Sequence, residues 1–346
     1  MDTKIAVVTG ATGQDARYLV PELRTRGYEV HAFVHDASAA QRIYGADEHV
    51  VVRRFDLQGE TIAAARAIAE LKPDVIFNLA GQSSVHRSFE QPALSWSLNA
   101  DWPLAVLEAI RRDTPRTRLY QASSSEMFGC LPGEAVVHDE TSAFRPQSPY
   151  AASKAAAHLA CGVYRESFGL AVACGILFNH ESRHRGEAFV TTKIVRHVRA
   201  LRAMTPAARE TAPPLRVGRL DVQRDWGFAA EYVRGILLIA DQLAVRNDGG
   251  GYRDYVLGTG VLTSVRDLID RAFALGGFAL DWSDDCARFR GTNRDAVQSV
   301  PELVRAAEPK AIQANPQRAL DELGWKATPD IDLFLRDMLQ ADEVSD

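Results

Sequence analysis

Short apolar segments with strand character alternate with helical segments along the first half of this chain. Six segments have the apolar pattern of buried strands, at residues 4–10, 28–34, 49–56, 74–81, 117–124 and 170–179. The intervening stretches 14–27 and 92–112 carry the periodicity of helices. Because this alternation is typical of a parallel sheet covered on both faces, we predict an α/β fold with a doubly wound sheet of about seven mainly parallel strands.

The alternation ends after Asn179, where the sequence becomes loop-rich and includes the Pro-rich stretch 205–217. A helix is expected near 229–243 and a strand at 255–258, and two later helices are expected at 265–273 and 317–325. We expect this half to supply a smaller substrate-binding domain. The predicted division is a first domain at 1–178 that contains the parallel sheet, rejoined by about 222–258, and a second domain made from 179–221 and 259–346.

Composition narrows the class of partner. The chain has 346 residues, 46% hydrophobic and 25% charged, with a formal net charge of -5 and a pI near 6.0. This balance argues against nucleic acid or an anionic membrane as the main partner. The N-terminal segment alternates like a strand and lacks the pattern of a signal peptide, and we expect a cytoplasmic protein. The four cysteines lack metal-site or CxxC spacing, so we expect reduced core thiols, no metal and no disulfide.

A glycine-bearing turn, TGATGQDA, follows the first predicted strand. Gly10 and Gly13 allow the backbone to turn tightly and to approach a pyrophosphate, which the N-terminus of the next helix stabilises. Ala16, the third small position, allows close packing of that helix. A tight turn without a ligand is the alternative, but the position after the first strand of an alternating sheet favours a dinucleotide site.

The sequence SPYAASKAAAHL places Tyr150 and Lys154 four residues apart on a predicted helix, so the two side chains share one face. A neighbouring ammonium and an oxidised nicotinamide would favour the phenolate of the tyrosine. The phenolate can then accept a proton from a hydroxyl whose carbon loses hydride. The alternative is an ordinary surface pair on an amphipathic helix.

A carboxylate interrupts the row of hydroxyls in QASSSEMFG, directly after the apolar run TRLY. Glu126 at the end of a buried strand is costly to desolvate, which favours a chemical use for it. The alternative is a structural carboxylate that accepts backbone N–H groups at the strand end.

Taken together, these motifs resemble the GDP-mannose 4,6-dehydratase family of extended short-chain dehydrogenases/reductases over nearly the whole chain. The resemblance rests on TGATGQDARYL, NLAGQSSVHRSFEQP, QASSSEMFG, SPYAASK, GILFNHESRHRG, RDWGFAAEYV and AEPKAIQANPQRALDELGW. It implies a Rossmann-type sheet and an NAD(P)-dependent lyase that acts on a nucleotide diphosphate sugar. It also implies a catalytic set of Ser124, Glu126, Tyr150 and Lys154. In this chemistry Tyr150 takes a proton from O4, Glu126 removes the C5 proton, and water leaves from C6.

The resemblance further implies contacts with the two ligands. The cofactor contacts, besides Tyr150 and Lys154, would come from Gly10, Thr12, Gly13, Gln14, Asp15, Asp36, Asp56, Leu57, Leu79 and Ala80. The substrate contacts would come from Ser83, Ser84, Ser88, Asn179, Arg185, Val190, Lys193, Arg224, Arg305 and Glu308. The arginines suit a diphosphate because a guanidinium can bind two oxygens at once, although each could instead be an exposed charge.

Three departures from the family pattern bear on the ligands. The chain reads VHDAS where the family carries Arg-Arg-Ser, so NADP use and a tetramer are in question. Asp36 would repel a 2′-phosphate, and we expect NAD unless Arg53 and Arg54 hold that phosphate. The longer stretch 205–217 and the change of RPxE to RAAEP leave open a GDP- or ADP-linked heptose instead of GDP-mannose. A homodimer or homotetramer is expected.

Two other functions stay open at this point. A sugar-nucleotide 4-epimerase or reductase needs the tyrosine and the hydroxyl but not the carboxylate. A non-catalytic dinucleotide-binding sensor would tolerate loss of all four catalytic residues, and their joint presence argues against it.

Overall fold

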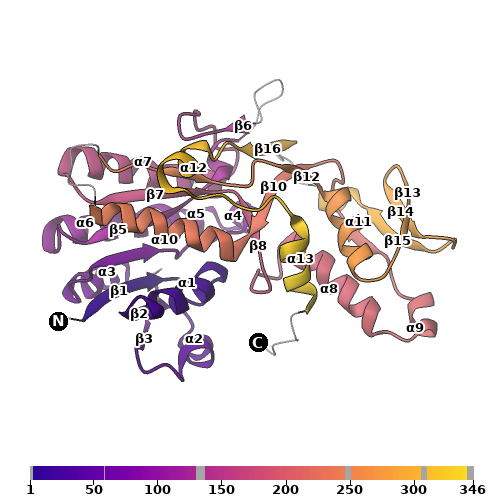
Figure 1. Ribbon diagram of the computed structural model, residues 1–346, viewed down its shortest axis with the longest axis horizontal. Coiled ribbons are helices and arrows are strands. Elements are labelled where there is room, and N and C mark those ends of the chain that lie inside the picture. Colours follow the sequence, from indigo (N-terminus) through magenta and orange to yellow (C-terminus); the bar gives the residue numbers. More distant parts are fainter. Residues whose placement is uncertain (1–2, 58, 130–136, 246–250, 305–309, 341–346) are drawn as a thin grey trace.

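The computed structural model describes residues 3–57, 59–129, 137–245, 251–304 and 310–340. A seven-stranded sheet forms its larger part, with the strand order β11-β7-β5-β4-β1-β2-β3 (Figure 1). All neighbouring pairs of this sheet run parallel, which confirms the predicted sheet. Its strands are β1 (Lys4–Thr9), β2 (Tyr28–Val34), β3 (Val50–Arg54), β4 (Val75–Asn78), β5 (Arg118–Ser124), β7 (Val172–Leu177) and β11 (Tyr255–Leu257).

Helices cover both faces of this sheet, as its strands require because both of their faces are apolar. One face packs against α1 (Gln14–Thr25), α2 (Ala37–Tyr44), α10 (Ala229–Val245) and α12 (Gln317–Leu323). The opposite side carries α3 (Thr61–Glu70), α4 (Val85–Glu90), α5 (Pro92–Trp96), the π-helical turn η1 (Ser97–Asp101), α6 (Trp102–Asp113) and α7 (Pro149–Phe168).

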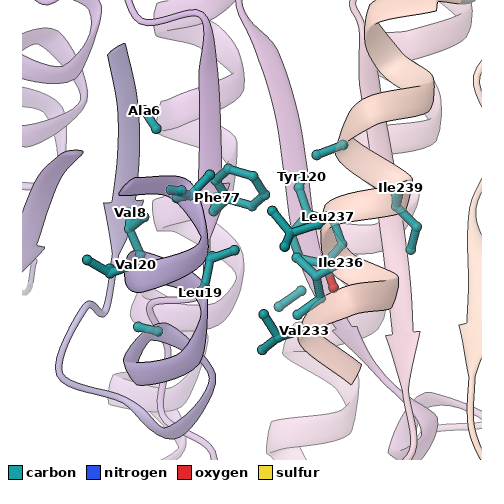
Figure 2. Packing of buried hydrophobic residues seen from close by; sticks show 14 of the residues in the cluster. Ala6, Val8, Leu19, Val20, Phe77, Tyr120, Val233, Ile236, Leu237 and Ile239 are labelled. Carbon is teal, nitrogen blue, oxygen red and sulfur yellow. The ribbon is translucent and has the colours of Figure 1, made fainter. Parts of the chain in front are cut away.

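Figure 2 shows why α1 and α10 pack onto the first face. Leu19 of α1 and Ile236 and Leu237 of α10 point toward Phe77 and Tyr120 of the sheet, and these side chains are fully buried or nearly so. Burial of each large apolar side chain contributes roughly 1.5–3 kcal/mol. The late helix α10 is therefore an integral part of the first core.

The second region contains two smaller sheets. One comprises β6 (Val137–His138), β8 (Asn179–Glu181), β10 (Gln223–Phe228), β12 (Leu262–Ser264) and β16 (Ala311–Ala314). The other comprises β9 (Leu215–Val217), β13 (Leu280–Ser283), β14 (Cys286–Phe289) and β15 (Asp295–Ser299). The helical elements are α8 (Val190–Ala203), α9 (Pro206–Glu210), α11 (Val265–Leu275), α13 (Ile331–Gln340) and the 3-10 turn η3 (Pro301–Leu303).

A separate hydrophobic cluster holds this region together. Val198 of α8, Leu268 and Phe273 of α11 and Phe334 of α13 are fully buried in it. The strand β11 nevertheless pairs with β7 of the large sheet, so the chain returns to the first region after leaving it. The residue boundaries of the two-domain division stay a prediction.

The described cysteines and helices bear on two further expectations. Cys161 and Cys174 are free and buried in the core, Cys286 is free and partly buried, and Cys130 lies outside the described residues. Among the helices that the structure describes, none combines the length and apolarity that crossing a bilayer requires.

Candidate functional site

The predicted cofactor residues lie in loops that follow consecutive strands of the large sheet. Gly10 follows β1, Asp36 follows β2, Leu57 follows β3, and Leu79 and Ala80 follow β4. Because these strands are parallel, their carboxyl ends meet at one edge, which is where open α/β sheets bind ligands. The segment with Ser124 and Glu126 follows β5 at the same edge, through the 3-10 turn η2 (Ser125–Met127).

The glycine-rich turn has the geometry of a phosphate cradle. Gly10 has φ +66, and a Cβ there would lie 2.9 Å from the backbone nitrogen of Ala80. Gly13 is the N-cap of α1 and donates its N–H to the Gly10 carbonyl at 2.9 Å. The following N–H groups at the start of α1 are the groups that bind pyrophosphate in dinucleotide sites. Thr12 is partly buried beside them, and its carbonyl accepts from Arg17 Nε at 3.3 Å.

A chain of buried hydrogen bonds connects this turn to Lys154 across three strands. Thr9 Oγ1 donates to Asn78 Oδ1 at 2.6 Å, and Asn78 Nδ2 donates to Gln121 Oε1 at 2.7 Å. The Ala122 carbonyl then accepts from both Gln121 Nε2 and Lys154 Nζ at 3.0 Å. Each of these polar groups therefore has a partner despite its burial, and Lys154 is held at the end of β5.

Tyr150 and Lys154 both lie on α7, four residues apart, and both are buried (8% and 7% exposed). Ser148, the N-cap of this helix, accepts from Ala151 N at 3.0 Å, and Pro149 occupies the first turn. This sequence of a serine cap followed by proline is a strong start signal for a helix. It fixes the tyrosine in the first turn, next to the end of β5.

Burial, rather than the lysine charge, dominates the electrostatics of the pair in the unliganded protein. The pKa of Tyr150 is raised to about 12, mainly by burial and also by the Glu126 charge, while Ser124 and Arg185 oppose the shift. Burial also lowers the pKa of Lys154 to about 8. Lys154 Nζ donates to the Ala122 carbonyl at 3.0 Å, and its predicted effect on the phenolate, together with an oxidised nicotinamide, stays a prediction.

The structure brings the four predicted catalytic residues together around Tyr150. The helix α7, which carries Tyr150 and Lys154, packs against β5 and η2, which carry Ser124 and Glu126, and both of these residues influence the pKa of the Tyr150 phenol. Ser124 is buried and Glu126 is only partly buried. The Ser124 Oγ accepts from the Glu126 backbone N–H at 3.3 Å, which fixes the turn that presents the carboxylate. The arrangement offers a phenol, a hydroxyl, an ammonium and a carboxylate at one place.

Beneath this site lies a buried polar cluster that the sequence argument missed. His158 Nδ1 lies 3.0 Å from Ser123 Oγ, and potential ligand atoms of His158, Cys174 and Asp254 lie within 4.8 Å of one another. Arg165 donates to both Asp254 oxygens at 2.8 and 3.0 Å. Because this ion pair occupies the carboxylate, the cluster supports β5 and α7 as a structural network. The expectation of no metal stays a prediction.

Asn99 is a second residue that the sequence argument missed. It lies in the π-helical turn η1, and π-helical turns often occur at functional sites. Its Oδ1 accepts from Gln82 N at 3.0 Å, and a Cβ on Gly81 would lie 2.5 Å from this oxygen and 3.6 Å from Lys154 Nζ. In the sequence, the only sign of a special role for Asn99 was a polar asparagine inside the helical pattern of residues 92–112.

The acidic residues of the predicted cofactor set have other partners in this structure. Asp36 is exposed and caps α2, because its Oδ1 accepts from Ser38 N at 2.8 Å and from Ala39 N at 3.0 Å. The side chains of Gln14 and Asp15 contact His180 and Ser182. Asp56 is exposed, and its carbonyl accepts from Glu60 N at 3.0 Å. Their direct contacts with a cofactor stay predictions.

The predicted substrate residues fall into two groups. Ser83, Ser84 and Ser88 lie at or near α4, where Ser84 caps the helix and the buried Ser88 donates to the Val85 carbonyl at 2.6 Å. The others belong to the second region: Asn179 on β8, Arg185 in the following loop, Val190 and Lys193 on α8, and Arg224 on β10. Arg305 and Glu308 lie outside the described residues.

Arg185 links this second group to the catalytic residues. Its guanidinium charge lowers the pKa of both Tyr150 and Asp15, so it lies close to both. Its side chain is 14% exposed, its Nε lies 3.1 Å from Glu181 Oε2, and its guanidinium lies 3.6 Å from the Phe189 ring centroid. Arg224 is buried and donates to the Gln223 carbonyl at 2.8 Å. Lys193 is exposed at the start of α8.

Solved structures of sugar-nucleotide enzymes share this fold. UDP-glucose 4-epimerase of Thermus thermophilus, solved with NAD, is similar with a TM-score of 0.76 and 23% identity over 97% of both chains. The dTDP-glucose 4,6-dehydratase of Bacillus anthracis, also solved with NAD, gives a TM-score of 0.75 and 18% identity over 97% of this chain and 96% of that one. These likenesses confirm the Rossmann-type fold.

Sequence comparison is more specific. GDP-mannose 4,6-dehydratase of Sinorhizobium fredii is 38% identical over 343 residues, covering 94% of this chain and 92% of that protein. GDP-mannose 4,6 dehydratase 2 of Arabidopsis thaliana is 36% identical over 352 residues, with 98% and 87% covered. The family model for GDP-mannose 4,6 dehydratase matches residues 7–338. The chain therefore belongs to the GDP-mannose 4,6-dehydratase family.

Proposed function

We propose that this chain is a nicotinamide-dependent nucleotide-sugar 4,6-dehydratase that converts GDP-mannose to GDP-4-keto-6-deoxymannose. The observation that carries the proposal is the position of Glu126 on η2, which follows β5 and packs against α7, the helix of the buried Tyr150 and Lys154. An oxidation at C4 requires a base, and an elimination across C5 and C6 requires a second acid–base group. The site supplies both, and the relatives over nearly the full length carry the name of this activity.

The residues at the strand ends fit a dinucleotide. Gly10 and Gly13 leave room beside the backbone that any side chain would fill, since a Cβ at Gly13 would lie 3.1 Å from the Gly10 carbonyl oxygen. The start of α1 offers free N–H groups and the positive end of a helix dipole to a pyrophosphate. When bound, the cofactor supplies a hydride acceptor for C4 and, once reduced, the donor for C6.

The chain's own residues move the protons. Tyr150 accepts the proton of the C4 hydroxyl, and for this its phenol must lose its own proton despite a pKa of about 12 in the unliganded protein. The Ser124 hydroxyl and the Arg185 charge both lower the pKa of the phenol and so oppose the effect of burial. Ser124 hydrogen-bonds the same sugar oxygen and fixes its distance from the phenol.

Glu126 performs the second half of the reaction. Once C4 is a ketone, the C5 proton is acidic and the Glu126 carboxylate removes it. The same carboxyl group, now protonated, donates a proton to the C6 hydroxyl as it leaves as water. Partial exposure of Glu126 suits this role, because the carboxylate must reach the sugar.

For the cofactor, we propose NAD rather than NADP. Asp36 presents a carboxylate at the end of β2, where the ribose hydroxyls of a dinucleotide lie in this fold. Of the two arginines that could hold a 2′-phosphate, Arg53 donates its Nε to His31 Nδ1 at 2.9 Å, which engages it elsewhere, and Arg54 is exposed. A negative charge on the ribose would therefore meet Asp36 first.

For the assembly, we propose a homodimer formed by α6 and α7. Trp96, Leu104, Leu159 and Val163 are 46%, 42%, 60% and 54% exposed, and they lie on α5, α6 and α7. Figure 1 shows these helices at the end of the molecule far from β13, β14 and β15. Exposed apolar side chains on neighbouring helices are typical of a surface covered by a partner. A cytoplasmic location stays a prediction from the sequence.

A product assay with deuterium at C4 of GDP-mannose tests the proposed reaction. We expect GDP-4-keto-6-deoxymannose with the label at C6, because the same cofactor molecule takes and returns it. Label returned to C4 of an inverted sugar would instead show a 4-epimerase, and release of reduced cofactor would show a dehydrogenase. Turnover of a GDP- or ADP-linked heptose in preference to GDP-mannose would overturn the substrate, and binding without turnover would favour a sensor.

A further inference from the structure

Two side chains of the glycine-rich turn reach the segment that leaves the large sheet for the second region. Gln14 Nε2 donates to the His180 carbonyl at 2.9 Å, and Gln14 Oε1 accepts from Ser182 Oγ at 3.0 Å. Asp15 lies beside the ring of His180, whose Nε2 is 3.1 and 3.2 Å from its two carboxylate oxygens. We call these contacts the Gln14–Asp15 latch. They join residues about 165 positions apart in the chain.

Both ring nitrogens of His180 face oxygen acceptors in this arrangement. Its Nδ1 lies 2.7 Å from the Phe178 carbonyl while its Nε2 faces Asp15. Both partners are acceptors, and a neutral imidazole has only one N–H to donate. Burial favours the neutral ring, but the Asp15 charge holds the pKa of His180 above its ordinary value. The ring also stacks on Tyr232 of α10 with the centroids 4.8 Å apart, so α10 contacts the same segment.

The latched segment leads directly to the predicted substrate residues. Residues 179–181 form β8, which pairs with β10, and the chain then passes through Arg185 to the start of α8. Arg185 lies near both Asp15 and Tyr150, since its charge lowers the pKa of each. Figure 1 shows β8 and β10 between the large sheet and α8. The latch therefore lies between the glycine-rich turn and the predicted substrate residues.

We propose that Gln14 and Asp15 are positioning residues that couple cofactor binding to formation of the nucleotide-sugar site. This inference rests on the proposed function, because it takes the cofactor to bind at Gly10 and Gly13. A pyrophosphate there immobilises the first turn of α1 through its N–H groups. The side chains of that turn then restrain His180 and Ser182. This segment has then lost part of its conformational entropy before the nucleotide sugar binds. The nucleotide sugar therefore has less entropy to remove, so each ligand tightens the binding of the other.

Titration calorimetry with two probes tests this coupling. The affinity for GDP, which does not react, is measured with and without saturating NAD. In the unchanged protein we expect NAD to tighten GDP binding by roughly fivefold or more. In Gln14→Ala and in Asp15→Asn, the ratio of the GDP affinities with and without NAD should fall below about twofold. Equal GDP affinity with and without NAD in the unchanged protein, or an unchanged ratio in both variants, would overturn the proposal.

Matched variants separate coupling from stability. Asp47→Asn is the control for Asp15→Asn, because Asp47 also pairs with a residue of α1, Arg24 at 3.1 Å, but lies outside the latch. It should keep the full ratio. Ser182→Ala should also lower the ratio, because it removes the hydrogen bond from Ser182 Oγ to Gln14 Oε1. The double variant should lose no more than Gln14→Ala alone, since Gln14→Ala already removes that bond. Additive losses would show that the bond between them does not carry the coupling.

Hydrogen exchange keeps the test independent of the nucleotide. NAD alone should slow exchange in residues 179–190 of the unchanged protein and should do so much less in Gln14→Ala. If GDP fails to bind in any state, the proposed substrate is wrong, while the exchange result still decides the latch. Equal protection by NAD in the unchanged protein and in Gln14→Ala would overturn the latch whatever the substrate is.

Discussion

Glu126 is the side chain that distinguishes an elimination from a simple oxidation at this site. We expect Glu126→Gln to fold, because the amide is nearly isosteric, and to oxidise C4 but not to eliminate water. Loss of the base should slow product formation by roughly 10²- to 10⁴-fold. Reduced nicotinamide absorbance should then accumulate with substrate while little 6-deoxy product forms.

Tyr150→Phe provides the matched comparison. Because the phenol acts before the carboxylate, this variant should block even the first oxidation, and no reduced cofactor should accumulate. Near-normal product formation by Glu126→Gln would assign Glu126 to a structural role. Tyr150 and Lys154 would then be the residues left to support the proposed reaction.

Burial of the Lys154 ammonium in the same site lowers the stability of the folded protein. Its pKa falls from 10.5 to about 8 on folding, which corresponds to a penalty of roughly 3 kcal/mol at neutral pH. The penalty is complete below the folded pKa, where both states are protonated, and disappears as the pH rises to the unfolded pKa. We therefore expect Lys154→Met to be inactive but to unfold at a higher temperature than the unchanged protein at pH near 7.

The stability gain of Lys154→Met should shrink between the two pKa values and be small by about pH 10.5. Lys326→Met serves as the control, because Lys326 is exposed and its replacement should change the melting temperature little at either pH. A gain of equal size at both pH values would show that packing of the methionine, rather than relief of the buried charge, causes it.

Among the elements, α2 combines a structural cap with a proposed determinant of cofactor choice. Asp36→Ala should lower stability by about 1 kcal/mol through loss of the cap and should also weaken the preference for NAD. Asp36→Ser keeps an oxygen that can cap the helix but removes the charge. We expect the serine variant to retain its melting temperature while its NAD-to-NADP affinity ratio falls by roughly tenfold.

Equal affinity ratios in the unchanged protein and in Asp36→Ser would remove Asp36 from cofactor recognition. Tighter binding of NADP than of NAD by the unchanged protein, measured by direct titration, would contradict the proposed cofactor itself. Arg53 and Arg54 would then be the first residues to replace.

Some elements could be predicted from the sequence and others could not. The strands of the large sheet were predictable, because buried parallel strands are continuous apolar runs and their helices start with strong signals such as Ser148 and Pro149. The helix α8 was missed: its N-cap is Phe189, which makes no side-chain capping bond. Its buried face packs against α11 and α13 from far along the chain, so tertiary contacts stabilise it.

The candidate site shows the same limit. Tyr150, Lys154, Ser124 and Glu126 were identified from short motifs, because their spacing on one helix or one turn is local. Asn99 was missed because its position depends on a π-helical turn. The actual partners of Asp15 were missed because His180 reaches it only through the fold. Sequence patterns indicate which residues share an element, but contacts between distant elements require the structure.

At the scale of the whole molecule, the exposed face of α7 makes the assembly testable. Leu159→Glu and Val163→Glu place charges on the proposed dimer surface, and each should shift the protein toward the monomer in light scattering after size exclusion. Ile62→Glu is the control, because Ile62 is 67% exposed on α3 and lies outside this surface. A monomeric unchanged protein, or dimers that survive both substitutions, would contradict the proposed face.

The return of the chain to the large sheet has a consequence for recombination among relatives. The strand β11 completes that sheet and α10 covers Phe77 and Tyr120, yet both come after β8, α8 and β10 in the chain. A fragment that stops near residue 178 would therefore leave an edge of β7 and an apolar face without cover. A new sugar specificity cannot be transplanted as one cassette with a single junction. Donor and recipient must exchange at least two separate stretches, on either side of α10 and β11, and the latch must be matched in both.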